Sequence, residues 1–140
     1  MMLLYTIPLA FAAIEDWKKR TIPDWCWIAI LALGSVSALF YNVPYLPLLH
    51  RITGFLLPGI CLLILAVKFG GIGGGDIKLT TAMGFTFGIY GLAFILFFAL
   101  IPAWIYTVTT KQKSIPLAVF LFAGFLAYAI LFSNSYFTIP

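Results

Sequence analysis

Residues 91–110 read GLAFILFFALIPAWIYTVTT, a stretch of 20 residues without a charged side chain. About 20 predominantly apolar residues form a helix long enough to cross the roughly 30 Å hydrocarbon core of a bilayer. Five further apolar segments lie on either side of it, at residues 2–20, 25–42, 52–69, 76–90 and 115–134. The pattern predicts an all-α integral membrane protein, with about six transmembrane helices bundled in a single domain over residues 1–140.

The composition argues against a soluble fold. Hydrophobic residues make up 64% of the chain and charged residues 9%, and the mean hydropathy is +1.12. Soluble domains are about half apolar and about a quarter charged, and a small domain leaves much of its surface in water. The net charge of +4 does not indicate nucleic-acid binding, because the basic residues are scattered at the ends of apolar runs. We expect the lipid bilayer, and no nucleic acid, as a partner.

Basic residues predict the orientation. If the N-terminus lies outside and the chain crosses six times, most of them fall on the cytoplasmic side: Lys18, Lys19, Arg20, Lys68, Lys78, Lys111 and Lys113. Arg51 falls outside, beside His50 in an outer loop, where the histidine is expected to be an ordinary loop residue. An excess of Lys and Arg in short cytoplasmic loops is what the positive-inside rule requires. We therefore expect a multi-pass protein of the inner (cytoplasmic) membrane.

Two further features have simple interpretations. Residues 1–13 are apolar with no basic residue before them, which is unlike a secretory signal, so we expect the first span there. Cys26 and Cys61 form no CxxC pair and have no neighbouring histidines, so no metal site is expected. No cofactor is expected either.

The chain contains four carboxylates: Glu15, Asp16, Asp24 and Asp76. A charge at membrane depth costs about 2.5–3.5 kcal/mol on insertion scales, so such acids are functional candidates. Asp16 precedes Arg20 by four residues, which places it about 6 Å deeper than the basic end of its helix. Glu15 points about 100° away around the same helix. Asp24 follows Pro23 at a helix start and is expected to act as an N-cap.

Asp76 follows the glycine-rich run at residues 70–75. The consecutive glycines Gly73, Gly74 and Gly75 remove side chains from its approach and permit backbone conformations closed to other residues. A substrate backbone could lie against such a loop. Two alternatives remain open: a flexible turn in which Asp76 caps the following helix, and a phosphate-binding loop, which is disfavoured because no strand precedes the glycines.

The predicted topology places Asp16 and Asp76 at the same, cytoplasmic, boundary. Two carboxyls that meet in a partly dry site meet the requirement for aspartyl hydrolysis, because like charges a few ångströms apart share one proton. The ionised partner then activates a water and the protonated partner polarises the scissile carbonyl. The sequence alone does not establish that the two helices touch.

The same residues resemble the signature of the type IV prepilin peptidases, a family of GxGD intramembrane aspartyl proteases. Its first part matches residues 16–24, DWKKRTIPD, in which an Asp precedes Pro-Asp by seven residues. Its second part matches residues 73–79, GGGDIKL. The chain is similar to the family over essentially its whole length, including KSIP at residues 113–116 before the last apolar segment.

The resemblance implies roles for individual residues. It implies that Asp16 and Asp76 are the catalytic pair and that Gly73 and Gly75 let the substrate approach Asp76. Lys78 matches the lysine of the motif, and we group it with the two glycines as substrate-binding. The implied substrate is a prepilin-like protein whose short basic leader ends in Gly and is cut at the cytoplasmic face. The paired CxxC insert of longer members, associated with N-methylation, is missing from this sequence, so cleavage alone is expected.

One hypothesis concerns the shared proton. Asp76 lies at a helix N-terminus with Lys78 nearby, and both features favour its charged form. Asp16 has Glu15 beside it, which disfavours ionisation. The sequence thus favours a proton on Asp16, although coupled groups have no strictly private protonation state.

Other functional classes fit parts of the pattern. Glycine breaks and an embedded acid are also used along ion paths, so a small transporter or channel subunit is one alternative. A scaffold that binds pilins without cutting them is a second. A third is a protease with a different substrate, such as an archaeal preflagellin or a signal-peptide remnant.

Overall fold

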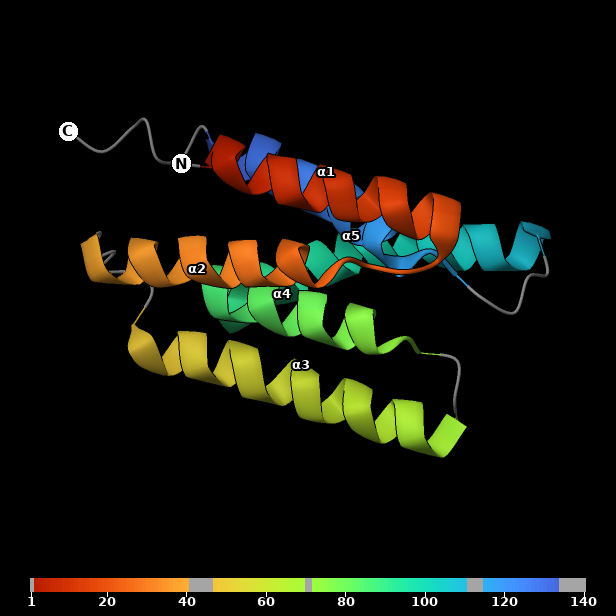
Figure 1. Ribbon diagram of the computed structural model, residues 1–140, viewed down its shortest axis with the longest axis horizontal. Helices are drawn as coiled ribbons and strands as arrows, with labels where there is room; N and C mark the ends of the chain where they lie inside the picture. Colours follow the sequence, from red (N-terminus) through yellow and green to blue (C-terminus); the bar gives the residue numbers. More distant parts are fainter. Residues whose placement is uncertain (1, 41–46, 70–71, 111–114, 134–140) are drawn as a thin grey trace.

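The computed structural model describes residues 2–40, 47–69, 72–110 and 115–133. Its elements, in order, are α1 (Met2–Lys19), α2 (Asp24–Phe40), α3 (Leu48–Phe69), α4 (Gly74–Thr110) and α5 (Leu117–Ser133). The helices lie side by side along the long axis of the molecule (Figure 1). The described residues contain no strand, so the predicted all-α class is confirmed.

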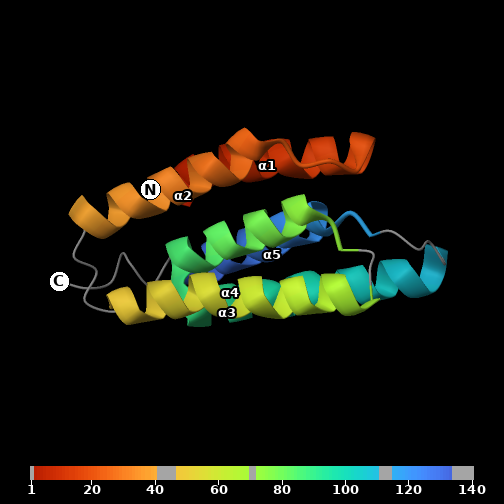
Figure 2. The ribbon, with the colours of Figure 1, turned by 60° about the horizontal axis from the view of Figure 1, so that its bottom comes forward.

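Helix α4 is two rods joined at Gly88. That glycine has φ 72° and ψ 175°, a combination that residues with a side chain rarely adopt. The first rod runs away from the glycine-rich turn and the second returns in the opposite direction (Figures 1 and 2). The break lies two residues before the boundary expected between residues 90 and 91.

The number of membrane spans is not confirmed. Residues 48–68 and 74–110 form helices long and apolar enough to cross a membrane, the second of them containing the break at Gly88. The helices at residues 24–40 and 117–132 are apolar but shorter. Counting α4 as two rods gives six helical segments in the described residues. This number of helices does not establish six membrane spans.

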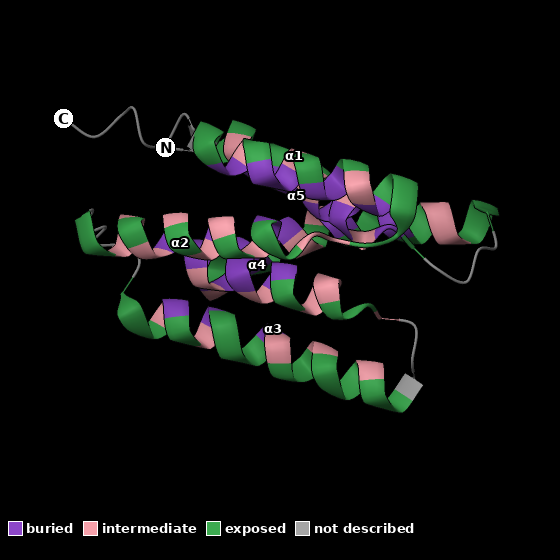
Figure 3. Cartoon of the chain, viewed as in Figure 1, coloured by how far each residue is buried: buried purple, intermediate pink, exposed green. Residues whose placement is uncertain are grey.

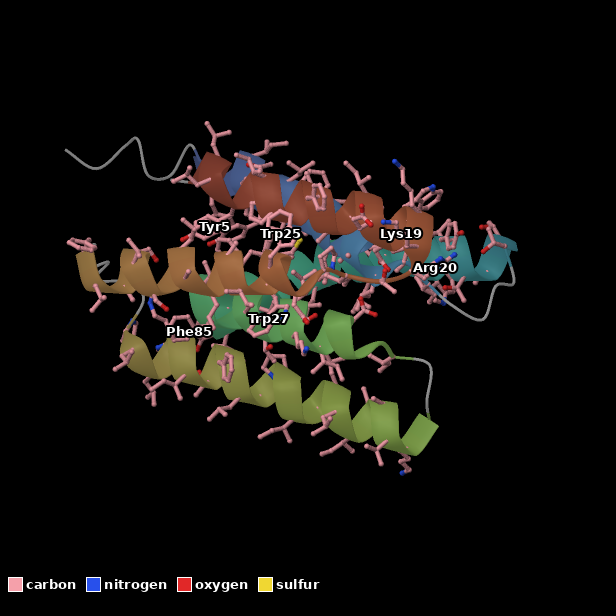
Figure 4. All side chains as sticks on the ribbon, in the orientation of Figure 1. Tyr5, Lys19, Arg20, Trp25, Trp27 and Phe85 are labelled. Atoms are coloured by element: carbon pink, nitrogen blue, oxygen red, sulfur yellow. The ribbon has the colours of Figure 1, made fainter. Side chains whose placement is uncertain are left out.

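The two ends of the bundle differ in charge. In Figure 1, α1 and α3 end, α5 and the first rod of α4 begin, and the second rod of α4 ends in the right half of the view, whereas α2 runs from the middle of the view to the left. Lys18, Lys19 and Arg20 follow one another at the end of α1, where Figure 4 labels Lys19 and Arg20. Lys68 is in the last turn of α3. Lys111 and Lys113 are outside the described residues.

The core lies between α1, α4 and α5, with one face of α2 against it (Figure 3). Its largest fully buried apolar side chains are Leu9, Ile30, Leu79, Met83, Leu92, Ile95, Leu121 and Phe125. Within the described residues, helix α3 makes extensive contacts with α4 and with no other helix. Most of its apolar side chains are exposed, including Leu56, Leu63, Ile64 and Val67. A soluble monomer rarely exposes so large an apolar face, whereas lipid covers such a face in a membrane.

Glycines permit the closest helix approaches. A methyl group on Gly84 of α4 would overlap the carbonyl oxygen of Gly54 on α3, and one on Gly54 would overlap the carbonyl oxygen of Gly84. Gly34 of α2 lies in the same way against the Thr86 hydroxyl. Small residues at helix crossings let backbones approach where lipid provides no hydrophobic drive for association.

Arg51 and His50 do not lie in an outer loop as expected. Both belong to the first turn of α3, and the Arg51 side chain is 4% exposed. Arg51 Nη1 donates to the carbonyl oxygens of Gly34, at 3.3 Å, and Thr86, at 3.5 Å. Thr86 precedes the break at Gly88, so its carbonyl is at a helix C-terminus, where a cation is favourable. The His50 ring lies 5.2 Å from that of Tyr90.

Replacing Arg51 with Met is therefore expected to lower the free energy of unfolding by about 1–3 kcal/mol, because carbonyl groups near the break lose a charged donor. Lys18→Met, which removes an exposed lysine, is the matched control and should leave stability unchanged. Denaturant titration in detergent measures both. An Arg51→Met protein as stable as the wild type would show that the guanidinium contributes nothing to the crossing of α2, α3 and α4.

Candidate active site

Asp16 lies in the last turn of α1 and is 5% exposed. Its Oδ2 accepts a hydrogen bond from the backbone N–H of Ala118 at 3.1 Å. Because α5 begins at Leu117, that N–H is among the first of the helix, which have no partner within it. The carboxylate of Asp16 therefore binds to the N-terminus of α5, a position that the helix dipole makes favourable for negative charge.

Asp76 is the third residue of α4. Its backbone N–H donates to the carbonyl oxygen of Gly73 at 3.1 Å, which closes the turn that leads into the helix. Its Oδ1 is buried, and the described residues provide no hydrogen-bond partner for it. The end of α1, which carries Asp16, and the start of α4, which carries Asp76, lie towards the same end of the bundle (Figure 1). The Asp16 carboxyl is within electrostatic range of Asp76.

Glu15, the neighbour of Asp16, faces elsewhere. Its Oε2 forms an ion pair with Lys19 Nζ at 3.0 Å, one turn along the same helix. Of the two adjacent acids on α1, Asp16 is buried against α5 and Glu15 is engaged with a lysine of its own helix.

Asp24 and Lys78 contact each other across two helices. Asp24 Oδ1 accepts hydrogen bonds from Trp27 Nε1 at 2.9 Å and from Lys78 Nζ at 3.0 Å. The Lys78 ammonium also lies 5.5 Å from the centroid of the Trp27 ring, where α2 faces the first rod of α4 (Figure 4). An N-cap residue precedes the helix and accepts a backbone N–H of its first turn. Asp24 is instead the first residue of α2, and its carboxylate accepts hydrogen bonds from the side chains of Trp27 and Lys78. The N-cap interpretation of Asp24 is therefore not supported.

The glycines before Asp76 differ in their surroundings. A methyl group on Gly75 would lie 3.0 Å from Ile22 Cβ, and one on Gly73 would lie 3.3 Å from Asp76 Oδ2. A methyl group on Gly74 would meet nothing within 4 Å. Gly70 and Gly71 are outside the described residues. The lack of a side chain thus lets the Asp76 carboxyl approach Gly73 and lets Ile22 approach Gly75. Substrate binding by Gly73, Gly75 and Lys78 stays a prediction.

Sequence reasoning missed Ala118 and Ile22. Ala118 contacts Asp16 through its backbone, and Ile22 is an ordinary apolar residue between α1 and α2. The Pro116 that precedes α5 was the available signal, because proline commonly stands at a helix start and the N–H groups of such a start attract carboxylates.

Comparison with known protein families decides which family this chain belongs to. A sequence model described as "Type IV leader peptidase family" matches residues 3–108. The chain belongs to the type IV leader peptidase family. The matched range contains Asp16, the Asp24–Lys78 contact and Asp76, so the resemblance drawn from the two motifs is confirmed.

Relatives within the type IV leader peptidase family are named as peptidases. The chain is 29% identical to the preflagellin peptidase of Methanococcus maripaludis over 143 residues, covering 90% of this chain and 55% of that protein. It is 32% identical to the prepilin leader peptidase/N-methyltransferase of Bacillus subtilis over 130 residues, covering 86% and 51%. The chain therefore spans about half the length of these relatives. No solved structure matches it.

Proposed function

We propose that this chain is an intramembrane aspartyl endopeptidase that removes the short basic leader from prepilin-like proteins, cutting after Gly at the cytoplasmic boundary of the inner membrane. The observation that carries the proposal is that two acids from distant parts of the sequence lie within electrostatic range of each other: Asp16 of α1, which is buried, and Asp76 of α4, whose Oδ1 is buried. The names of the relatives support the substrate class. The grouping of basic residues at the same end supports a cytoplasmic site with the N-terminus outside.

The hydrogen bonds suggest how the acids divide the chemistry. Asp16 accepts a hydrogen bond from a backbone N–H at the start of α5, and such a bond stabilises the ionised carboxylate. Lys78 pairs with Asp24, so the lysine expected to favour a charged Asp76 is engaged elsewhere. These contacts favour the reverse of the proton placement expected from sequence: charge on Asp16 and the proton on Asp76.

In the proposed reaction, Asp16 takes a proton from a water molecule while that water adds to the scissile carbonyl carbon. Asp76 donates its proton to the carbonyl oxygen, giving a neutral tetrahedral diol. Transfer of the proton from Asp16 to the departing amide nitrogen breaks the C–N bond, and Asp76 recovers a proton from the diol hydroxyl. The products are an acid and an amine, and both carboxyls return to their starting states.

The test uses purified protein in liposomes and a panel of prepilin-like and preflagellin-like substrates. Each substrate is prepared with its leader Gly and with that Gly replaced by Leu, and the products are identified by intact mass. We expect cutting directly after Gly and none in the Leu versions. A folded protein that cuts no member of the panel would contradict the proposed function.

The turn before Asp76 yields a second prediction. Gly75→Ala places a methyl group against Ile22 and is expected to lower the cleavage rate by about tenfold or more, because displacements near 1 Å at a catalytic group are costly. Gly74→Ala, whose methyl group meets nothing within 4 Å, should retain a rate within about twofold of wild type. Equal loss in both variants would show that the turn, and not the Ile22 contact, sets the requirement for glycine.

A further inference from the structure

Each of the two helix ends that carry the candidate acids is contacted from outside its own helix. Asp16 of α1 accepts a hydrogen bond from one N–H in the first turn of α5, that of Ala118. The first turn of α4, which carries Asp76, is contacted by the start of α2 and by the residues that precede it. The geometry between the two carboxyls therefore depends on how α2 and α5 are seated.

Contacts from the start of α2 converge on the turn that holds Asp76. Lys78, two residues after Asp76, extends its ammonium to Asp24 Oδ1 at 3.0 Å and lies 5.5 Å from the Trp27 ring centroid. Trp27 Nε1 donates to the same carboxylate oxygen at 2.9 Å. One oxygen of Asp24 thus connects an indole of α2 with an ammonium of α4. A cation beside both a carboxylate and an aromatic ring gains from each of them.

Ile22 continues these contacts towards Asp16. Its side chain packs against Gly75, directly before Asp76, so closely that a methyl group on that glycine would lie 3.0 Å from Ile22 Cβ. Ile22 is separated from Asp16 only by the end of α1 and a short linker, in which Arg20 donates its backbone N–H to the carbonyl oxygen of Asp16. A short covalent path therefore joins the helix that carries Asp16 to the residues that hold Asp76.

We infer that Asp24, Trp27 and Lys78 form a clamp that positions Asp76 relative to Asp16. These three are positioning residues, and none of them is assigned contact with the substrate. The inference rests on the proposed function, and it reassigns Lys78 from substrate binding. It also explains why Asp24 and Lys78 occur in the two separate motifs of the sequence: the motifs meet at this ion pair.

The clamp is exposed, with 51% of the Lys78 side chain and 67% of the Asp24 side chain accessible. Surface ion pairs contribute little to folding stability, so removing this one should leave the protein folded. The catalytic rate is more sensitive than folding stability to the position of Asp76, because a displacement of about 1 Å can lower the rate about 100-fold. The expected signature is therefore a loss of kcat in a protein of unchanged stability.

The experiment compares Asp24→Asn, Lys78→Met and the charge-swapped double variant Asp24→Lys/Lys78→Asp in liposomes with a prepilin-like substrate. Each single variant is expected to lower kcat by about tenfold and to change KM by less than about twofold. The double variant should recover part of the lost kcat, because the ion pair is restored with reversed sign while a lysine at position 24 cannot accept the Trp27 Nε1 hydrogen bond. Lys19→Met, which breaks the 3.0 Å ion pair with Glu15 at the same end of the bundle, is the control and should be unaffected.

Hydrogen–deuterium exchange over residues 72–80 provides a readout independent of cleavage. Exchange should rise in both single variants and fall back towards the wild-type level in the double variant. A raised KM with unchanged kcat and no recovery in the double variant would overturn the inference and assign Lys78 to substrate binding. A wild type that cuts nothing, with exchange that still follows the expected pattern, would overturn the proposed function and leave the clamp supported.

Discussion

Replacing either Asp16 or Asp76 with Asn is expected to lower the cleavage rate by about 10²–10⁴-fold, the usual contribution of general acid–base catalysis. Asn retains the size of Asp but neither takes a proton from water nor donates an acidic one. The loss should appear in kcat and kcat/KM together, because the interaction is made in the transition state. Product formation in liposomes, followed by intact mass under single-turnover conditions, measures it.

Glu15→Gln is the matched control for Asp16→Asn. Glu15 is adjacent in sequence and forms an ion pair with Lys19 of its own helix, so the cleavage rate of Glu15→Gln should stay within about twofold of wild type. A dead Glu15→Gln enzyme beside an active Asp16→Asn enzyme would mean that α1 presents its other acid to the site, one residue out of register.

The second large effect concerns stability at the crossing of α3 and α4. Gly84→Ala is expected to lower the free energy of unfolding by about 3 kcal/mol or more, the upper range for overpacking. The added methyl group would overlap the Gly54 carbonyl, and the neighbour is backbone that no rotamer change can move aside. Denaturant titration of the detergent-solubilised protein measures the change.

Gly74→Ala is the control for this helix, since its methyl group meets no neighbour within 4 Å. It should be neutral or slightly stabilising, because alanine is the better helix former. If Gly84→Ala and Gly74→Ala were equally stable, α3 would not approach α4 as closely as Gly54 and Gly84 place it.

The positions of the helices could be predicted because bilayer thickness and chain geometry fix the length of an apolar segment. The expected segments at residues 2–20 and 52–69 correspond to α1 and α3, and the boundary expected after residue 90 corresponds to the break at Gly88. Arg51 was placed wrongly because a charge at the end of an apolar run is normally expected at the interface. Its acceptors, the carbonyls of Gly34 and Thr86, come from other helices.

Within the candidate site, the acids could be singled out because carboxylates are rare in an apolar chain and costly at membrane depth. Their surroundings could not be predicted. Helices that are apolar on all sides give no pattern that says which face meets which neighbour. The contacts of Asp16 with Ala118, of Gly75 with Ile22 and of Lys78 with Asp24 depend on such choices. Catalysis by Asp16 and Asp76 stays a prediction.

The most direct test of the central claim, that these two acids work as one site, is a double-mutant cycle with Asp16→Asn, Asp76→Asn and the combined variant. Residues that act as a unit are strongly non-additive. We expect the combined variant to cleave no more slowly than the slower single variant. Losses that multiply in the combined variant would contradict a shared site, because each carboxyl would then contribute without the other.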